Sequence, residues 1–271
     1  MLVSVIIPTY NRASFLKEAI SSVLNQDYPS FELIVVDDGS IDETTSMIDD
    51  YGDRIKYIRI SHQGVSKARN IGISQAQGEL ITFLDSDDIW RPKKLSIQVE
   101  FFKHCPDALV CQTEEIWIRN GVRVNPKKYH KKPSGMIFEQ CLKRCMVSTS
   151  AAMIHKVLFE AVGLFDESFP VCEDYDLWLR VAKTYPIYLL EKPLVIKKGG
   201  HIGQLSKMSC LDKWRIAAIE KLLNTNTLSS NQRHLAIEEL TLKCNIYGKG
   251  CLKRGRLEEG FYYLNLPKKY E

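Results

Sequence analysis

The chain has 271 residues, of which 45% are hydrophobic and 26% are charged, so it can bury a substantial core without disulfides. Its 37 Lys and Arg side chains only slightly outnumber its 33 Asp and Glu side chains, which gives no case for nucleic-acid binding. No apolar run approaches the roughly 20 residues that cross a bilayer, so we expect no transmembrane segment, while peripheral membrane attachment stays open.

The cysteine pattern and the first ten residues of the sequence indicate the cellular compartment in which the protein is expected to lie. Eight cysteines are scattered along the chain without a C-x-x-C pair or a completed His/Cys zinc pattern. The opening MLVSVIIPTY lacks the basic region of a secretory signal. Both features predict a cytoplasmic protein with reduced thiols, and the inner face of the cell membrane is an open alternative.

The first hundred residues alternate short apolar runs, typical of buried strands, with helical patterns. Alternation of this kind predicts an α/β protein with a largely parallel sheet flanked by helices. The predicted strands cover 4–8, 31–36, 55–60 and 79–84, and the predicted helices cover 12–26, the residues after Ser40, 64–77 and the residues after Pro92.

The pattern changes after residue 106, and it is helical throughout from about residue 209. We therefore predict one α/β domain over residues 1–208 and a helical C-terminal extension over residues 209–271. Phe261, Tyr262 and Tyr263 are expected to pack against the α/β domain, with contact to a membrane surface as the alternative. Between 106 and 209 the expected elements are a strand at 108–118, a basic loop at 119–134, a strand at 150–154 and helices near 155–163 and 172–186.

Carboxylates follow two of the predicted strands, in VVDDGS (35–40) and ITFLDSDD (81–88). Open α/β sheets bind ligands outside the carboxyl ends of their strands, and several acids gathered there would repel one another without a cation between them. The Asp-x-Asp spacing of Asp85 and Asp87 puts two carboxylates on the same side of an extended chain. Oxygen ligands of this kind suit Mg²⁺ or Mn²⁺, so the sequence predicts a divalent-metal site that faces a phosphorylated ligand.

Six motifs in a fixed order carry a resemblance that covers roughly residues 3–205. The sequence resembles the family 2 glycosyltransferases, which implies the Rossmann-like GT-A fold of nucleotide-diphospho-sugar transferases. The motifs are SVIIPTYNR (4–12), VVDDGSIDET (35–44), GVSKARNIGI (64–73), GELITFLDSDD (78–88), GLFDES (163–168) and EDYDLWLR (173–180).

The resemblance implies a role for individual residues on the nucleotide side. Tyr10 and its two preceding residues would line the base pocket, Asp38 would hydrogen-bond the uracil edge, and Arg69 would reach the base or the diphosphate. The full set implied for nucleotide-sugar binding is Pro8, Thr9, Tyr10, Arg12, Asp38, Ser66, Arg69, Asp85 and Ser86.

The resemblance also implies a metal site and a catalytic pair. Asp85, Asp87 and His201 would hold Mn²⁺ or Mg²⁺, with Asp85 also directed towards the ribose. In the pair formed by Glu173 and Asp174, Asp174 would be the general base. A base opposite the leaving group removes the proton of the acceptor hydroxyl, and a single displacement then inverts the anomeric configuration.

The implied function is inverting transfer of a sugar from a nucleotide-diphospho-sugar, most simply a UDP-sugar, to a hydroxyl of a glycan or lipid-linked acceptor, in cell-surface polysaccharide or glycolipid assembly. Two alternatives stay open. One is a Mg²⁺-binding phosphoacceptor regulator of the receiver type, and the other is an inactive module that binds nucleotide sugars. The basic loop 119–134 is either a solvated loop or an attractor for an acidic or phosphate-bearing acceptor.

Overall fold

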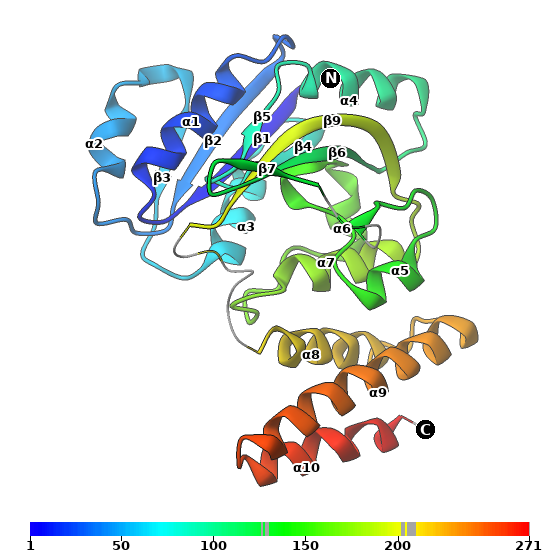
Figure 1. Cartoon of the computed structure of the whole chain (residues 1–271). Coiled ribbons are helices and arrows are strands. Elements are labelled where there is room, and N and C mark those ends of the chain that lie inside the picture. Colours follow the sequence, from blue (N-terminus) through cyan, green and yellow to red (C-terminus); the bar gives the residue numbers. More distant parts are fainter. Residues whose placement is uncertain (126, 128–129, 202–203, 205–209, 271) are drawn as a thin grey trace.

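The computed structural model describes residues 1–125, 127, 130–201, 204 and 210–270 (Figure 1). Its first part alternates strands and helices in the predicted order. The elements are β1 (Val3–Thr9), α1 (Ala13–Leu24), β2 (Phe31–Asp37), α2 (Thr44–Asp49), the 3₁₀ turn η1 (Gly52–Arg54), β3 (Lys56–Arg59), α3 (Val65–Gln75), β4 (Leu80–Phe83), β5 (Ile89–Trp90) and α4 (Lys94–His104).

The remaining elements complete the sheet and then form a helical end. After α4 come β6 (Val110–Arg119), β7 (Val122–Val124), α5 (Phe138–Lys143), η3 (Thr149–Ala151), β8 (Ala152–His155), α6 (Val157–Val162), α7 (Glu173–Ala182) and β9 (Tyr188–Gly199). The C-terminal helices are α8 (Leu211–Leu223), α9 (Ser230–Lys253), α10 (Leu257–Asn265) and the 3₁₀ turn η5 (Leu266–Lys269).

One sheet runs through the molecule in the order β3-β2-β1-β4-β8-β6-β9-β5, and β7 pairs with β6. Its first four strands are parallel, so β1, β2, β3 and β4 all end at the same edge. The strand β8 is antiparallel to both β4 and β6, whereas β6 and β9 are parallel. The predicted α/β class, with a helix-flanked central sheet and a helical C-terminal segment, is confirmed.

The sequence patterns missed the strands β5, β7 and β9 and the helix α5, and two of these strands shape the later part of the sheet. The strand β9 has no simple alternation of buried and exposed residues, and Pro193, which cannot donate a ladder hydrogen bond, lies at its irregular register with Glu114. The basic segment 119–134 is not only a loop, because its start forms a hairpin between β6 and β7. Asn120 and Gly121 both have positive φ there, 49° and 77°, as a two-residue type I′ turn requires.

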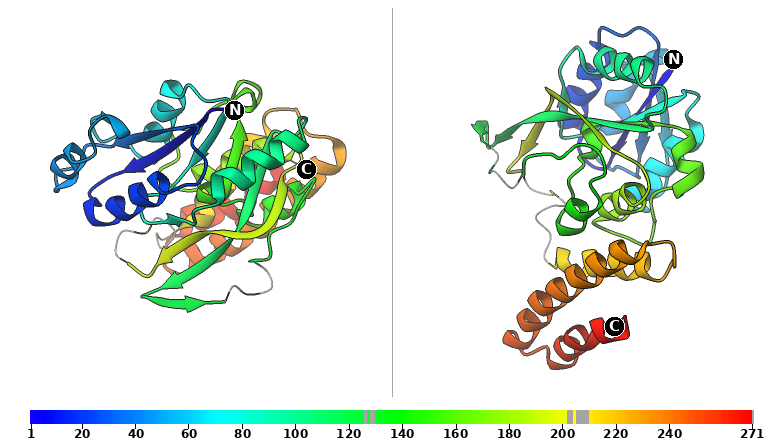
Figure 2. Two further views of the ribbon diagram at one scale, coloured as in Figure 1. Left: turned by 90° about the horizontal axis from the view of Figure 1, so that it is seen from above. Right: turned by 90° about the vertical axis from the view of Figure 1, so that its right-hand side faces the viewer.

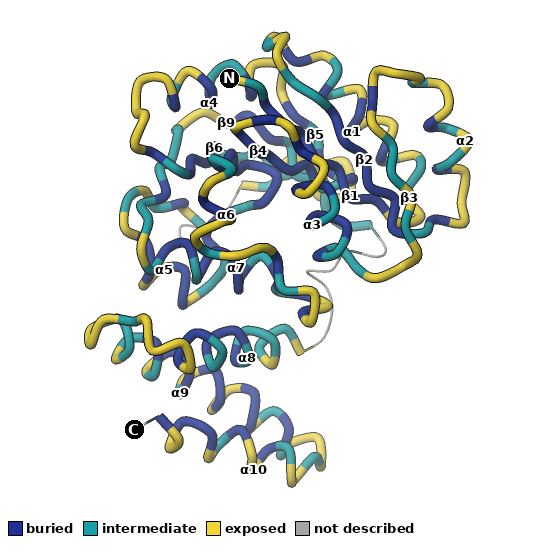
Figure 3. The backbone as a smooth tube through the Cα atoms, turned by 180° about the vertical axis from the view of Figure 1, so that it is seen from behind, coloured by how far each residue is buried: buried dark blue, intermediate teal, exposed yellow. Residues whose placement is uncertain are grey.

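Buried residues follow the central strands and parts of the flanking helices (Figure 3), and hydrophobic side chains fill both faces of the sheet. One cluster packs α1 and α4 against the sheet, and the other packs α3, α5 and α7 against its opposite face. Close contact positions α3, because a Cβ at Gly72 would clash with the Ile6 side chain of β1. The start of α3 is thereby held beside the ends of the parallel strands.

The C-terminal helices extend the second cluster, since Ile216, Ile219 and Leu222 of α8 join the core that contains Trp178 of α7. Figure 2 shows these helices, in orange and red, on the side away from the sheet. Tyr263 is buried as predicted, but Phe261 and Tyr262 are 56% and 57% exposed, so the expectation that all three pack inside is wrong. Over the described ranges, no helix combines the length and apolar character needed to span a bilayer.

Candidate active site

The ends of β1, β2 and β3 bring Tyr10, Asp38 and His62 together. Asp38 accepts backbone N–H bonds from Gln63 and Gly64, both at 2.8 Å, and its Oδ2 lies 2.8 Å from Nδ1 of His62. The exposed ring of Tyr10 stacks on His62 with 4.0 Å between centroids and 19° between planes. A carboxylate has about four lone-pair positions, so Asp38 keeps acceptor capacity for a ligand N–H beside this aromatic pair.

His62 was not predicted, although its position carried a signal. It lies just after β3, where a parallel strand reaches the same edge of the sheet as Asp38 and Tyr10. The second and fourth predicted strands are followed by clusters of acids, whereas the third predicted strand is followed by the single imidazole of His62. An open hollow of about 630 Å³ adjoins this cluster and is lined by residues 10–15, Asp42 and Glu43.

The smaller residues predicted to bind nucleotide are buried at this edge. Pro8 and Thr9 form the end of β1, Ser66 lies in the first turn of α3, and Ser86 lies between Asp85 and Asp87. The hydroxyls of Thr9 and Ser66 have no hydrogen-bond partner within the described part of the chain. Buried hydroxyls in that state are costly unless a ligand or water satisfies them.

Asp87 is the meeting point of three segments. Its Oδ2 accepts a hydrogen bond from Nη1 of Arg12 at 2.9 Å and lies 2.8 Å from Nε2 of His201. Arg12 directly precedes α1, and His201 follows β9. The structure therefore joins two predicted metal ligands, Asp87 and His201, that are far apart in sequence. We call Tyr10, Arg12, Asp38, His62, Asp85, Asp87 and His201 the strand-end rim.

Not every acid of the two clusters faces this rim. Asp37 is fully buried and accepts hydrogen bonds from the backbone of Ser40 and the hydroxyl of Tyr57. Asp88 is 2% exposed and accepts the backbone N–H of Lys198, so it anchors β9. Burial raises the pKa of Asp88 to about 8, against the opposing charge of Lys197. The expectation that all five acids point into one ligand site is wrong for these two.

A divalent cation at this rim would take part of its ligands from the predicted side chains and the rest from a bound diphosphate or water. Within the residues the structure describes, no three His, Cys, Asp or Glu side chains converge into a complete ligand set. Asp87 and His201 nevertheless offer an oxygen and a nitrogen 2.8 Å apart, and Asp85 belongs to the same short loop. Mg²⁺ commonly uses one or two carboxylates and takes its other ligands from phosphate and water.

Arg69 ties the strand-end rim to α7. Its Nη2 donates to Oδ1 of Asp85 at 2.8 Å, and its Nη1 donates to Oε1 of Glu173 at 2.6 Å. The guanidinium is 3% exposed and lies 5.0 Å from the ring centre of Phe165. Although burial opposes their charges, Arg69 and Lys197 hold the pKa of Asp85 below its usual value, whereas burial raises the pKa of Glu173 despite Arg69.

Asp174 is half-buried in the first turn of α7, where the helix dipole favours a negative charge. Its Oδ1 accepts the backbone N–H of Tyr175 at 2.7 Å, and its Oδ2 accepts a hydrogen bond from the Cys145 thiol at 3.3 Å. Burial and the neighbouring Asp174 charge raise the pKa of Cys145 well above its usual value. The thiol therefore stays protonated and donates; this contact was not predicted from the sequence.

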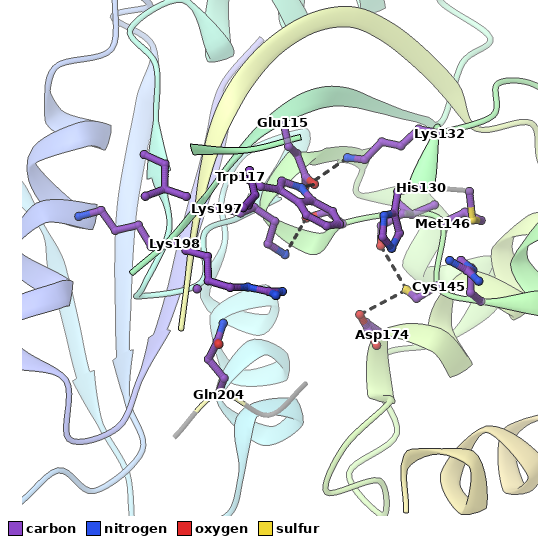
Figure 4. A pocket seen from close by; sticks show the side chains of 17 residues that line it. Glu115, Trp117, His130, Lys132, Cys145, Met146, Asp174, Lys197, Lys198 and Gln204 are labelled. Carbon is purple, nitrogen blue, oxygen red and sulfur yellow. Dashed lines mark hydrogen bonds and ion pairs between the residues drawn. The ribbon is translucent and has the colours of Figure 1, made fainter. Parts of the chain in front are cut away.

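Asp174 faces a cavity of about 350 Å³ between α7, the segment 144–148 and the strands β6, β7 and β9 (Figure 4). We call this cavity the Asp174 pocket. Glu115, Trp117 and Lys197 extend into it from the sheet, while Asp174 and Cys145 close its opposite side. Arg69 places the strand-end rim and the Asp174 pocket next to each other.

An α/β fold with a polar rim at its strand ends and an adjoining carboxylate pocket is the layout that the sequence predicted for a GT-A glycosyltransferase. The chain belongs to glycosyl transferase family 2, whose family model matches residues 4–163. Both the predicted family and the predicted fold class are therefore confirmed.

Relatives with curated names support this assignment. The chain is similar to the UDP-Glc:alpha-D-GlcNAc-diphosphoundecaprenol beta-1,3-glucosyltransferase WfgD of Escherichia coli, with 34% identity over 202 residues, 73% of this chain and 76% of that protein. It is also 35% identical over 216 residues to an uncharacterized glycosyltransferase of Rickettsia conorii, which covers 76% of this chain but only 35% of that relative. The chain thus spans about a third of that relative's length.

Among solved structures, the fold is similar to S. aureus TarS, residues 1–349, in complex with UDP-GlcNAc. The TM-score is 0.79 at 22% identity, and the match covers 98% of this chain and 79% of that chain. At this level of identity the similarity supports the fold, including the C-terminal helices of the present chain.

Proposed function

We propose that this protein transfers a sugar from a nucleotide-diphospho-sugar, a UDP-sugar in the simplest case, to a hydroxyl of a glycan or lipid-linked acceptor. One observation carries the proposal: Arg69 contacts Asp85 and Glu173 at 2.8 Å and 2.6 Å. A residue set suited to a nucleotide diphosphate and Glu173, the residue next to the proposed base Asp174, thus lie on either side of one buried guanidinium.

The donor assignment rests on the strand-end rim. Tyr10 and His62 offer a stacked pair for a base, and Asp38 beside them keeps acceptor capacity for a ring N–H. The relative WfgD is named for a UDP-Glc donor, and the similar TarS structure is a complex with UDP-GlcNAc. These features together favour a UDP-sugar as the donor of this chain.

Asp174 is the proposed general base, with Glu173 as its supporting neighbour in the catalytic pair. In the proposed reaction the acceptor hydroxyl gives its proton to Asp174 while its oxygen attacks the anomeric carbon, and the bond to the nucleoside diphosphate breaks. Attack from the face opposite the leaving group inverts the anomeric configuration. The Cys145 thiol, at 3.3 Å from Oδ2, orients the carboxylate during this transfer.

Asp85, Asp87 and His201 are the residues that would hold Mn²⁺ or Mg²⁺. When bound, such an ion supplies positive charge that stabilises the departing diphosphate. Without it, Asp87 is balanced by Arg12 at 2.9 Å and by His201 at 2.8 Å. We propose that Arg12 remains beside the diphosphate when the donor binds and adds to its neutralisation.

We further propose a place for the protein in cell-surface polysaccharide or glycolipid assembly, in the cytoplasm or at the inner face of the membrane. The division into a catalytic domain over 1–208 and a helical extension over 209–271 belongs to the same proposal. The start of α8 at Leu211 supports the division into two parts. The lipid-linked acceptor named for the relative WfgD supports the place in polysaccharide or glycolipid assembly.

A panel of nucleotide sugars tests the proposal, each assayed with and without Mn²⁺ for a rise in the thermal midpoint and for release of nucleoside diphosphate. Binding of one donor, accompanied by transfer, is expected, and NMR of the product reports the anomeric configuration. Tight binding without turnover on any acceptor would favour the inactive binding module. Labelling of Asp85 by acetyl phosphate would favour the phosphoacceptor regulator.

A further inference from the structure

The Asp174 pocket has an unusual charge for a cavity that must receive a sugar hydroxyl. Its lining includes five Lys or Arg side chains against two carboxylates, Glu115 and Asp174. The cations are Arg119, Lys132, Arg144, Lys197 and Lys198. A neutral saccharide requires no such excess, because hydroxyls are recognised by uncharged donors and acceptors as well as by ions.

One of the two carboxylates is satisfied by the pocket wall. Glu115 lies 3.2 Å from Nζ of Lys132 and accepts a hydrogen bond from Nε1 of Trp117 at 3.0 Å. Although burial opposes its charge, Lys132 and Lys197 lower the pKa of Glu115 to about 2. Its negative charge is therefore balanced within the wall, and Asp174 is the other carboxylate of the lining.

The cations of the pocket come from more than one side: Lys197 and Lys198 belong to β9 of the sheet, and Arg144 belongs to the segment 144–148. Lys198 pairs with Glu18 at 2.6 Å, and Lys197 lies 3.9 Å from Asp88, so these two cations have carboxylates nearby. Around His130 the balance differs, because burial together with the charges of Arg144 and Lys127 lowers the pKa of its imidazole. Cations dominate the surroundings of this ring.

An aromatic surface lies beside these cations. The rings of Trp117 and His130 are 4.8 Å apart and tilted by 52°, and both line the pocket (Figure 4). An aromatic ring offers a broad apolar face with a polar edge, which suits contact with the C–H face of a sugar. Cys145 and Asp174 lie on the other side of the same cavity, within reach of a hydroxyl on that sugar.

We propose that the Asp174 pocket is the acceptor site and that it selects an acceptor whose sugar carries a phosphate group. Arg119 and Arg144 bind the phosphate, Trp117 contacts the sugar ring, and the hydroxyl to be glycosylated points to Asp174. Guanidinium groups bind phosphate oxygens through two parallel hydrogen bonds, which makes arginine the favoured partner for this anion. The inference rests on the proposed function and adds the chemical class of its acceptor.

Binding measurements test the inference without requiring turnover. The donor site is first saturated with UDP and Mn²⁺, so that a second phosphate cannot enter it. Titration calorimetry then compares the 1-phosphates of glucose, galactose and N-acetylglucosamine with the matching methyl glycosides and with glucuronic acid. We expect at least one 1-phosphate to bind roughly tenfold or more tightly than its methyl glycoside, because charged hydrogen bonds exceed neutral ones.

Matched variants locate the binding. Arg144→Gln and Arg119→Gln each remove a pocket cation, whereas Arg123→Gln removes an exposed cation of the same hairpin that does not line the pocket. We expect the first two to lower the affinity for the 1-phosphate roughly tenfold and the third to leave it unchanged. Arg119 is exposed on the hairpin, so its variant remains informative if Arg144→Gln does not fold.

Each outcome bears on a different statement. Equal affinity for 1-phosphates and methyl glycosides, or equal losses in Arg123→Gln and Arg144→Gln, overturns the phosphate site while the proposed transferase stands. Equal binding of glucuronic acid overturns the choice of phosphate. If UDP does not bind and no donor is turned over, the proposed function itself fails.

The source of the phosphate is resolved by two acceptor substrates. A sugar diphosphate with a short prenyl tail represents a lipid-linked acceptor, and an oligosaccharide joined by phosphodiesters represents a phosphate-containing glycan. The acceptor that has the lower KM with the wild type identifies the source of the phosphate. For that acceptor, we expect KM to rise more in Arg144→Gln than in Arg123→Gln. No rise in KM for either substrate contradicts the inference.

Discussion

The strand-end rim and the Asp174 pocket are built in different ways. Most of the rim follows directly from the ends of β1, β2, β3 and β4, which are parallel and consecutive in sequence. The pocket instead draws on β6, β7, β9, the segment 144–148 and the start of α7. Parallel topology delivers the first site to one edge almost automatically, whereas the second depends on packing among distant segments.

This difference teaches where specificity can vary. A rim that recognises a nucleotide uses short motifs, each confined to a strand end and the residues after it. The pocket combines side chains whose positions depend on an irregular strand, a tight hairpin and helix packing. We therefore expect changes in the rim to abolish donor use, and changes in the pocket to alter which acceptor is used.

The largest expected effect tests whether the pocket side holds the base. Asp174→Asn should lower kcat by about a hundredfold to ten-thousandfold, the usual contribution of a general base, while UDP binding at the rim is unchanged. The control is Asp107→Asn, which alters an exposed acid just before β6, at the edge of the sheet opposite the strand ends. Full activity in Asp174→Asn would show that Asp174 is not the base. It would also contradict the assignment of donor binding to the rim and of proton removal to the pocket.

The next prediction concerns the residue that joins them. Arg69→Met leaves the partly buried carboxylate of Asp85 and the buried carboxylate of Glu173 without their shared cation and should destabilise the fold by about 3 kcal/mol. Urea unfolding measures this, with Arg54→Met at an exposed position as the control. Adding Glu173→Gln should restore part of the loss, because one uncompensated charge is removed. Additive losses in the double variant would show that the two side chains act independently.

A smaller effect is expected at the thiol beside the base. Cys145→Ala removes a hydrogen bond that holds the Asp174 carboxylate in place. The loss of kcat/KM should be roughly fivefold, equivalent to about 1 kcal/mol for one hydrogen bond. Cys145→Ser should retain most of the activity, and Cys141→Ser, at a buried thiol in the preceding turn, should leave kcat/KM unchanged. An unchanged kcat/KM in Cys145→Ala would leave the thiol with a packing role only.

The smallest effect concerns support for α7 from the C-terminal helices. Lys221 of α8 lies 2.7 Å from Asp166 and 2.9 Å from Asp176. Burial opposes the charge of Asp166, yet its bonds with Lys221 and Ser168 lower its pKa to about 2. Stability from a carboxylate with a lowered pKa is present above the unfolded pKa of about 4 and is lost as the pH falls towards 2.

Lys221→Met should therefore cost roughly half a kcal/mol at pH 7, a modest value because the pair is partly exposed to solvent. The difference from the wild type should shrink between pH 4 and pH 2. Lys213→Met, in the same helix and 4.0 Å from Glu259, should show a smaller change at pH 7. A difference that stays constant down to pH 2 would assign the effect to packing of the lysine stem.

Sequence patterns were most informative for polar residues that directly follow a predicted strand. The acids of VVDDGS and ITFLDSDD lie where predicted, although Asp37 and Asp88 serve the fold instead of the rim. His62 was missed because a single imidazole after a strand forms no motif of its own. The Asn120-Gly121 pair is a hairpin signal that lies within a segment of strongly basic composition, which resembles a solvated loop.

The α/β plan and the order of the first elements followed from the sequence alone, because strand and helix periods are local properties, and six motifs in a fixed order carried the resemblance that indicated the family. Tertiary structure decided the contact of His201 with Asp87, the placement of Arg69 between Asp85 and Glu173, and the thiol of Cys145 on Asp174. These contacts join residues separated by 16 to 114 positions, and only the packing of α3, α7 and β9 brings such residues together. No local pattern encodes those distances, so the second site became visible only in the folded chain.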